Sequence, residues 1–207
     1  MTLAFSIAAL AAAIIVTLGF AAGLNVYATV FSLGVMARLH WVVLPAGLGG
    51  LTNPWVMGAS GALFLMEFVA DKVPGFDLVW NALHTFVRIP AAAVLAYAAS
   101  TQLSPGMHVL VTALGAAMAA AAHGSKMSAR LTVTPSPEPV SNIALSAGED
   151  GAAIGLTWLA LHHAVAAASI VCGLTVAGCW LVWWGVRRVR GGWAGFVRRW
   201  RGEKGAV

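Results

Sequence analysis

Long runs of apolar residues, separated by short polar breaks, make up most of the chain. A helix of about 20 apolar residues spans a bilayer, whereas a membrane β-strand alternates apolar and polar residues. The continuous runs seen here predict an all-α integral membrane protein with about seven membrane segments. The expected segments cover residues 3–24, 26–40, 55–70, 76–100, 107–122, 142–163 and 164–186.

Two of these segments are short or interrupted. Residues 26–40 are few for a span, and Pro90 breaks the run over 76–100, because proline removes a helical hydrogen bond. Residues 128–140 are polar and contain three prolines, so we expect no regular helix there.

Composition narrows the class of protein further. The chain is 60% hydrophobic and only 9% charged, whereas an ordinary soluble domain carries about 25% charged residues. So few charges cannot cover a soluble surface. Disorder is excluded as well, because disordered chains have low hydrophobicity.

The positive charge is concentrated at the C-terminal end. Residues 187–207 hold seven basic residues and one acidic residue, while residues 1–186 hold five basic and six acidic ones. We therefore expect a transmembrane domain over 1–186 and a basic cytoplasmic tail over 187–207, since Lys and Arg stay on the cytoplasmic side. Tryptophans among the arginines favour membrane lipids as the partner of this tail, and we expect no nucleic acid. Alternation then places the loops at 71–76 and 124–140 in the cytoplasm.

Nearly all other charges lie in two windows of the chain. The first contains Glu67, Asp71, Lys72, Asp77 and Arg88, and the second contains Lys126, Arg130, Glu138, Glu149 and Asp150. Ionisable groups are costly in hydrocarbon, so they face a protein interior, a water-filled cavity or an interface.

Helical spacing places these polar groups on shared faces. Glu67 and Asp71 are four residues apart and project from one face. Two longer stripes follow, made of Asp77, Asn81, His84 and Arg88, and of Glu138, Asn142, Ser146 and Glu149. Glu138 is expected just before its helix, because Pro139 suits a helix start. We expect both stripes to meet in one wet space with protein walls.

The two windows also indicate an internal repeat. Gly61-Ala62 precedes Lys72 by the same separation as Gly115-Ala116 precedes Lys126. Each copy then has an asparagine followed seven residues later by a charge, which is Arg88 in one copy and Glu149 in the other. Duplicated halves with interrupted helices are typical of transporters. The opposite signs predict that Arg88 and Glu149 pair across a pseudo-two-fold axis.

The polar strings resemble those of a bacterial family catalogued as a domain of unknown function (number four-one-two-six). The resembling strings are Gly23–Tyr27, the acidic and lysine positions of Glu67–Asp77, Trp80–Arg88 and Ser136–Asn142. The resemblance covers most of the chain between residues 20 and 160. It implies a small multi-pass membrane protein and carries no established activity.

Several of these residues have two interpretations. Glu67 and Asp71 either bind a cation or relay protons, or they form a helix-end salt bridge with Lys72 or Lys126. His84 is a proton-linked ligand or a hydrogen-bonded packing residue.

The remaining polar side chains are also ambiguous. Asn25, Asn81 and Asn142 either cap helices or help helix N-termini to bind an anion. Adjacent histidines such as His162 and His163 diverge on a helix, so we expect neither a metal nor a cofactor.

The leading functional hypothesis is a transporter or channel for a small polar or ionic solute in the bacterial inner membrane. A thin bundle of this size also suits a homodimer. The alternatives are a membrane scaffold or assembly factor that binds a partner protein, and a membrane enzyme acting on lipid head groups. An enzyme is less favoured because no nucleophile elbow, phosphate loop or zinc spacing is present in the sequence, and we assign no catalytic residue. The expected pathway residues are Glu67, Asp71, Lys72, Asp77, Asn81, His84, Arg88, Lys126, Glu138, Asn142, Glu149 and Asp150.

Overall fold

The computed structural model describes residues 2–73, 75–133 and 139–200, and over these ranges the chain is helical and contains no strand. The elements are α1 (Thr2–Arg38), the 3-10 helix η1 (Ala46–Thr52), α2 (Pro54–Ala70), α3 (Phe76–Ala99), α4 (Pro105–Val133), α5 (Pro139–His162) and α6 (Ala164–Trp200). Four stretches are long and apolar enough to cross a membrane, namely Ser6–Arg38, Phe76–Ala99, Pro105–Leu131 and Ala164–Trp184. The protein is therefore an α-helical membrane protein.

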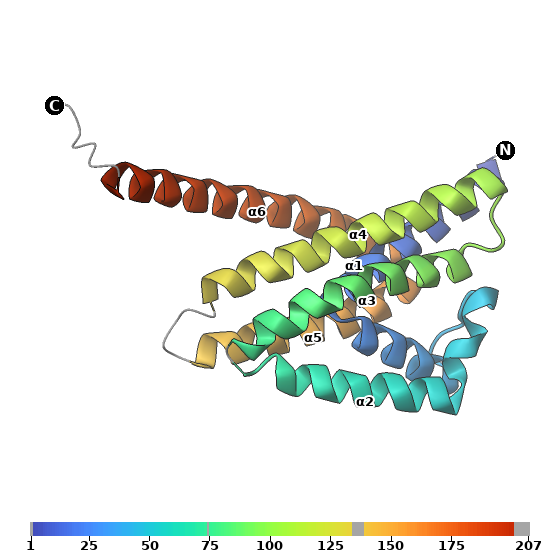
Figure 1. Cartoon of the computed structure of the whole chain (residues 1–207). Helices are drawn as coiled ribbons and strands as arrows, with labels where there is room; N and C mark the ends of the chain where they lie inside the picture. Colours follow the sequence, from blue (N-terminus) through green and yellow to red (C-terminus); the bar gives the residue numbers. More distant parts are fainter. Residues whose placement is uncertain (1, 74, 134–138, 201–207) are drawn as a thin grey trace.

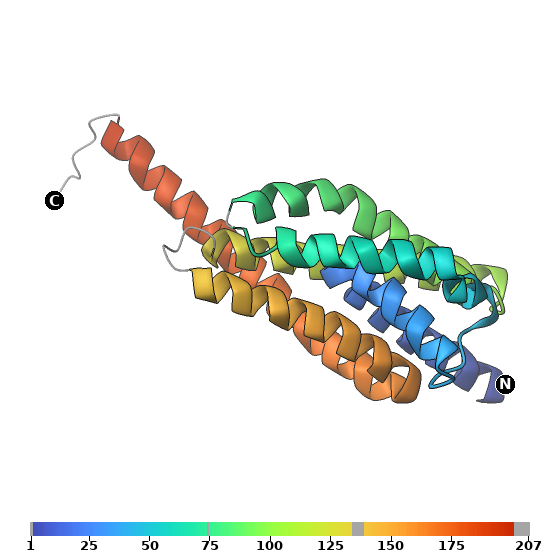
Figure 2. The same cartoon turned by 90° about the horizontal axis from the view of Figure 1, so that it is seen from below.

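Helix α1 is broken at Asn25. The backbone of Asn25 is extended, with φ −151° and ψ 101°, and its side-chain oxygen accepts a hydrogen bond from the backbone N–H of Ala28 at 2.9 Å. This bond caps the second arm of α1, as the cap interpretation of Asn25 predicts. In Figures 1 and 2 the two arms turn back on each other, so that their far ends lie at the same end of the molecule.

The remaining helices form two hairpins and a long final helix. The turn between α2 and α3 lies at the same end of the bundle as the end of α4 and the start of α5 (Figures 1 and 2). The N-terminal end of α1 and the turn between α3 and α4 lie at the opposite end (Figure 1). Helix α6 returns to the first end and extends past the other helices.

Two sequence-based boundaries are wrong. Helix α4 continues to Val133, so residues 128–133 are helical rather than irregular. Their polar character reflects buried Arg130, which binds carboxylates on neighbouring elements. Helix α3 also runs through Pro90 without a break, and Figure 2 shows it bowed. A membrane helix tolerates proline where its neighbours compensate for the lost backbone bond.

Small residues let α1 approach α4 closely. A Cβ atom added at Gly19 would overlap the carbonyl oxygen of Gly115, and one added at Gly23 would overlap that of Ala119. Helices in membranes associate through such close contacts, because lipid supplies no hydrophobic force between them. The backbones of α1 and α4 are therefore in close contact at these positions.

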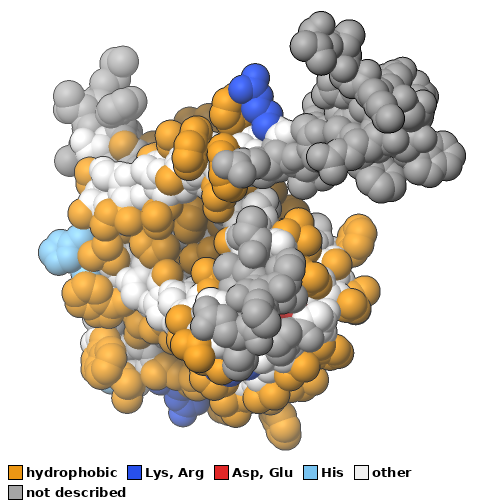
Figure 3. Space-filling view, turned by 90° about the vertical axis from the view of Figure 1, so that its left-hand side faces the viewer, with side chains coloured by type: hydrophobic (Ala, Val, Ile, Leu, Met, Phe, Trp, Pro, Cys, Tyr) orange, Lys and Arg blue, Asp and Glu red, His pale blue; other side chains and the backbone are white. Residues whose placement is uncertain are grey.

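Apolar side chains face outward from α3 and polar ones face inward. Val79, Leu83 and Phe86 are exposed, whereas the stripe of Asp77, Asn81, His84 and Arg88 is buried. Figure 3 shows hydrophobic side chains around the rim of the molecule with few charges between them. This distribution is the reverse of that in a soluble protein and suits contact with lipid tails.

Candidate functional site

Buried charged side chains from α2, α3, α4 and α5 meet inside the bundle. We call this set the ionic network. It contains the acids Glu67, Asp71, Asp77, Glu149 and Asp150 and the bases Arg88, Lys126 and Arg130. None of these residues is more than 8% exposed, so the network is shielded from solvent in this conformation. Asn25, Asn81, Asn142 and His123 form hydrogen bonds with members of the network.

Arg88 of α3 forms one end of the network. Its guanidinium makes an ion pair with Glu67 of α2. Nη1 also donates to the Asn81 side-chain oxygen at 2.9 Å and contacts Nδ1 of His123 at 2.8 Å. Arg88 and Glu149 make no ion pair among the described residues, so the predicted pairing of these two is wrong. Glu149 pairs with Arg130 and Lys126 instead.

Lys126 of α4 lies at the centre. Its ammonium is 2.7 Å from the Asp71 carboxylate, 3.2 Å from that of Glu149 and 3.5 Å from that of Glu67. It also donates to the backbone carbonyl of Leu24 at 3.2 Å. Leu24 immediately precedes the break in α1, so its carbonyl has lost the regular helical partner. Lys126 therefore connects the acids to the broken helix.

Arg130, one helical turn further along α4, contacts three carboxylates. Its nitrogens are 2.5 Å from Glu149, 3.1 Å from Asp71 and 3.4 Å from Asp77. Arg130 also donates a hydrogen bond to the side-chain oxygen of Asn142 at 3.3 Å. A planar guanidinium with five N–H donors suits such a set of acceptors. Arg130 thereby links α4 to α5 and to the start of α3.

Asp150 of α5 differs from the other acids. Its Oδ1 accepts a hydrogen bond from the Asn25 amide at 2.8 Å, while its Oδ2 is buried without a hydrogen-bond partner. Within the described ranges it makes no ion pair, whereas each of the other four network acids makes at least one.

The predicted site residues outside this centre have different surroundings. The His84 ring stacks on that of Trp80, with ring centres 4.4 Å apart. Its Nδ1 lies 2.8 Å from the Trp80 backbone carbonyl oxygen, and its Nε2 lies 3.2 Å from the Tyr27 hydroxyl. These contacts fit the packing interpretation of His84. Lys72 lies half-buried at the edge, 3.4 Å from the Ser146 hydroxyl and 2.9 Å from the centre of the Phe68 ring. Glu138 lies outside the described residues.

Arg130 of the network, and Asn25 and His123, which form hydrogen bonds with the network, were not among the predicted pathway residues. Arg130 falls in the segment expected to be a loop, and His123 falls at an expected helix end. His123 and Arg130 lie on one face of α4 with Lys126, because Lys126 follows His123 by three residues and Arg130 follows it by seven. That periodic spacing is the signal in the sequence that could have found them.

Two charged groups outside the membrane-spanning segments have shifted pKa values. Burial tends to raise the pKa of Asp71, but attraction to Lys126 and Arg130 and hydrogen bonds from Lys126 and Asn81 outweigh it, so the pKa is lowered from 3.8. Burial lowers the pKa of Lys72 from 10.5, although Asp150 and Asp71 attract it. Asp71 is thus held in its charged form by its neighbours.

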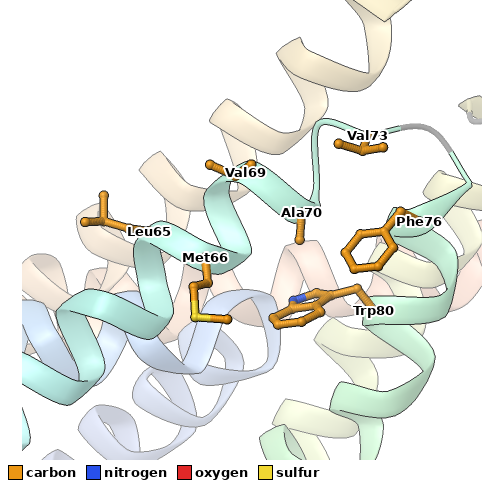
Figure 4. Close-up of a pocket in the computed structure, with 7 residues that line it drawn as sticks. All are labelled: Leu65, Met66, Val69, Ala70, Val73, Phe76 and Trp80. Atoms are coloured by element: carbon orange, nitrogen blue, oxygen red, sulfur yellow. The ribbon is translucent and has the colours of Figure 1, made fainter.

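An apolar cavity of about 540 Å³ lies beside the network, between α2 and α3. It is lined by Leu65, Met66, Val69, Ala70, Val73, Phe76 and Trp80, and Figure 4 shows the Trp80 indole between Met66 and Phe76. Because Trp80 also stacks on His84, it separates this apolar space from the polar interior. The lining carries no charge, so the cavity suits lipid tails rather than a polar ligand.

The network is short of positive charge. Five acids against three bases leave an excess of two negative charges, 5 − 3 = 2, if all are ionised. Burying ions is costly, and pairing compensates only where partners are complete. In the part of the chain that is described, no three His, Cys, Asp or Glu side chains are placed to hold a metal ion.

Apolar helices that enclose paired charges beside a broken helix define a polytopic membrane protein with an internal polar site. The family described as "Domain of unknown function (DUF4126)" matches residues 12–184. The chain belongs to this family, which confirms the resemblance found in the sequence, and all network residues lie within the matched range. No curated protein and no solved structure matches the chain.

Proposed function

We propose that this protein is a transporter or channel for a small polar or ionic solute in the bacterial inner membrane. The observation that carries the proposal is a cluster of eight buried charged residues beside the break in α1. Two of them contact the break, Lys126 at the Leu24 carbonyl and Asp150 at Asn25. Charged residues inside a membrane protein are expensive and mark solute or ion pathways. Discontinuous helices near the membrane centre form the binding sites of many transporters.

Burial of the charges supports a pathway over a docking surface. A scaffold would present its charges to a partner, whereas Glu67, Asp71, Arg88 and Arg130 have exposures of 0%. In the described conformation the ion pairs close the interior. Passage of a solute then requires that some pairs separate, and the solute replaces them with its own charges or hydrogen bonds.

The topology belongs to the same proposal. We count the two arms of α1 as separate segments, which together with α2 to α6 give seven. The basic residues of 187–207, most of which lie in the last part of α6, favour a cytoplasmic C-terminal end by the positive-inside rule. The α2–α3 turn, the end of α4 and the start of α5 then face the cytoplasm as well.

An internal repeat is also part of the proposal, with α2–α3 as one copy and α4–α5 as the other. The asparagines that correspond in the two copies both bind Asp71. Asn81 donates to its carboxylate at 2.9 Å, and Asn142 donates to its backbone carbonyl at 3.3 Å. This convergence supports a duplicated hairpin that meets at a central acid.

Flux measurements in liposomes test the proposal. Purified protein is reconstituted and assayed with protons, Na⁺, K⁺ and small organic ions as probes. The wild type is expected to move at least one of them, and Glu67→Gln and Arg88→Gln are expected to lose this flux. Arg38→Gln is the matched control, because Arg38 is exposed and its Nη1 donates to the Thr52 backbone carbonyl at 3.3 Å.

Folding must be separated from flux. Each variant is compared by circular dichroism and gel filtration, and the paired variant Glu67→Gln/Arg88→Gln removes the ion pair without leaving one charge unmatched. Folded wild-type protein that moves none of these probes would overturn the proposal. So would full flux in a folded paired variant.

A further inference from the structure

The excess of negative charge in the network has to be neutralised. Even if half-buried Lys72 is counted with the three buried bases, five acids exceed four bases by one, 5 − 4 = 1. A carboxyl group that is buried without a compensating charge binds a proton in preference to staying ionised. At least one acid of the network is therefore expected to be neutral in this conformation.

The geometry singles out Asp150 as that acid. Each other network acid contacts a base, whereas Asp150 is hydrogen-bonded by the uncharged Asn25 amide, which donates to Oδ1 at 2.8 Å. Oδ2 is buried and accepts no hydrogen bond. An ionised carboxylate inside a protein needs donors at both oxygens, whereas a protonated carboxyl is uncharged and costs less to bury when one oxygen lacks a partner. Glu67 also has an unpartnered oxygen, but its other oxygen pairs with Arg88 and Lys126.

Four charged groups act on Asp150 from the elements around it. Lys126 of α4 and Lys72 beyond α2 favour its ionised form, whereas Glu67 and Asp71 oppose it. Lys126 is already engaged by Asp71 at 2.7 Å and by Glu149 at 3.2 Å. Glu67 lies 3.5 Å from the same ammonium, so ionisation of Asp150 would add a fourth carboxylate charge near a lysine that already has three.

We propose that Asp150 carries a proton on Oδ2 in the closed conformation and releases it when the ionic network opens, which makes the proton the coupling ion of transport. The inference rests on the proposed function, since a coupling ion requires a transported solute. In the release step the O–H bond of Asp150 breaks, its electron pair stays on Oδ2, and the proton passes to water that enters the opened site. Binding of a proton from water on the other side restores the closed form.

The contacts of Asn25 connect this proton to the fold. The Asn25 amide nitrogen binds Asp150, and its side-chain oxygen caps the second arm of α1 at Ala28. The preceding carbonyl, that of Leu24, binds Lys126. A charge that appears on Asp150 thus acts directly on the residue at the break and on Lys126 beside it. Opening at the break is the conformational change that we expect deprotonation to favour.

Two neighbouring acids of α5 provide a matched test. Asp150→Asn imitates a neutral side chain and keeps an oxygen that can accept from Asn25. Glu149→Gln removes the charge from a side chain that pairs with Arg130 and Lys126. If Asp150 is protonated, Asp150→Asn unfolds within a few degrees of the wild type, whereas Glu149→Gln unfolds at a clearly lower temperature.

Infrared spectroscopy detects the proton itself. We expect the spectra of the wild type and of Glu149→Gln to show the carbonyl stretch of a protonated carboxyl. This band should shift on exchange into heavy water, and it should be missing from the spectrum of Asp150→Asn. In liposomes, a pH gradient is expected to drive solute uptake by the wild type and by Arg38→Gln, and not by Asp150→Asn.

The outcomes separate the two proposals. Spectra of the wild type and Asp150→Asn that show the same protonated carboxyl would overturn the inference, whatever the flux assay finds. Stabilisation of the wild type, and not of Asp150→Asn, by added Na⁺ or K⁺ would also overturn it, because a metal cation would then occupy the site. Solute flux that is independent of a pH gradient and is retained in Asp150→Asn would support the proposed function and contradict the role of the proton as coupling ion. Absence of any flux in the wild type would end the proposed function, while the spectra would still decide whether Asp150 holds a proton.

Discussion

Arg130 binds Asp71 at two points. Its Nη1 donates to the Asp71 backbone carbonyl at 2.7 Å, and its Nη2 lies 3.1 Å from the Asp71 carboxylate. Asp71 is the residue that ends α2, so this pair fixes the end of one hairpin to the interior of the other. The same guanidinium reaches Glu149 of α5. A single side chain therefore holds the end of the bundle where the two hairpin connections lie.

Replacement of Arg130 by lysine tests this role. Arg130→Lys keeps the charge but has one nitrogen, which cannot reach the Asp71 carbonyl and several carboxylates together. We expect the free energy of unfolding to fall by about 2–3 kcal/mol, as for the loss of charged hydrogen bonds. Chemical unfolding in detergent measures it. Arg38→Lys, at an exposed position, serves as the control, and equal stability of the two variants would contradict the role.

The pair between Glu67 and Arg88 allows a double-mutant cycle. Glu67→Gln leaves buried Arg88 without an acid, and Arg88→Gln leaves Glu67 only its longer pair with Lys126 at 3.5 Å among the described residues. Each single variant is expected to cost about 3–5 kcal/mol. The paired variant is expected to cost less than the sum of the two by about 1–3 kcal/mol. Unfolding curves of the four proteins give this coupling energy. Additive effects would show that the two side chains do not depend on each other.

The close approach of α1 to α4 predicts an effect of a single methyl group. Gly23→Ala places a Cβ against the backbone of Ala119, which cannot move aside as a flexible side chain can, so we expect a loss of about 1–3 kcal/mol. In Gly124→Ala the new Cβ meets nothing within 4 Å. That control is expected to gain up to about 1 kcal/mol, because alanine favours helix over glycine. Thermal unfolding of both variants distinguishes contact from helix propensity.

Acid is expected to destabilise the fold through Asp71. The pKa of Asp71 is lowered in the folded protein from 3.8, so the folded state binds its proton more weakly than the unfolded state does. Its contribution to stability is complete above the unfolded value and is lost as the pH falls through the lowered folded value. Unfolding temperatures measured from about pH 7 to about pH 3 should fall steeply at the acid end. The fall should be shallower in Asp71→Asn, and an unchanged profile in that variant would refute the assignment.

The sequence was sufficient for features that depend on local pattern. The stripe of Asp77, Asn81, His84 and Arg88 could be predicted because helical spacing alone puts these residues on one face, and that face is buried. The break at Asn25 was predictable in the same way, since two apolar runs meet at a good capping residue.

Features that depend on distant contacts were harder to predict. Arg130 was assigned to a loop because hydrophilic residues before prolines usually form one, and only burial against α5 explains why helix continues there. The predicted partner of Arg88 was wrong for a similar reason. Opposite charge at equivalent positions suggested Glu149, but which acid lies near depends on how the hairpins pack, and α2 brings Glu67 there instead.

The bend at Asn25 also affects the number of times that the chain crosses the membrane in the proposed topology. Both arms of α1 have their far ends on one side of the bundle (Figures 1 and 2), so in the proposed topology this long apolar stretch contributes no net crossing. In that topology each of α2 to α6 crosses once, and the start of α1 and the end of α6 face opposite sides. A straight α1 would reverse that relation, so the geometry of one asparagine determines which compartment meets the N-terminal end.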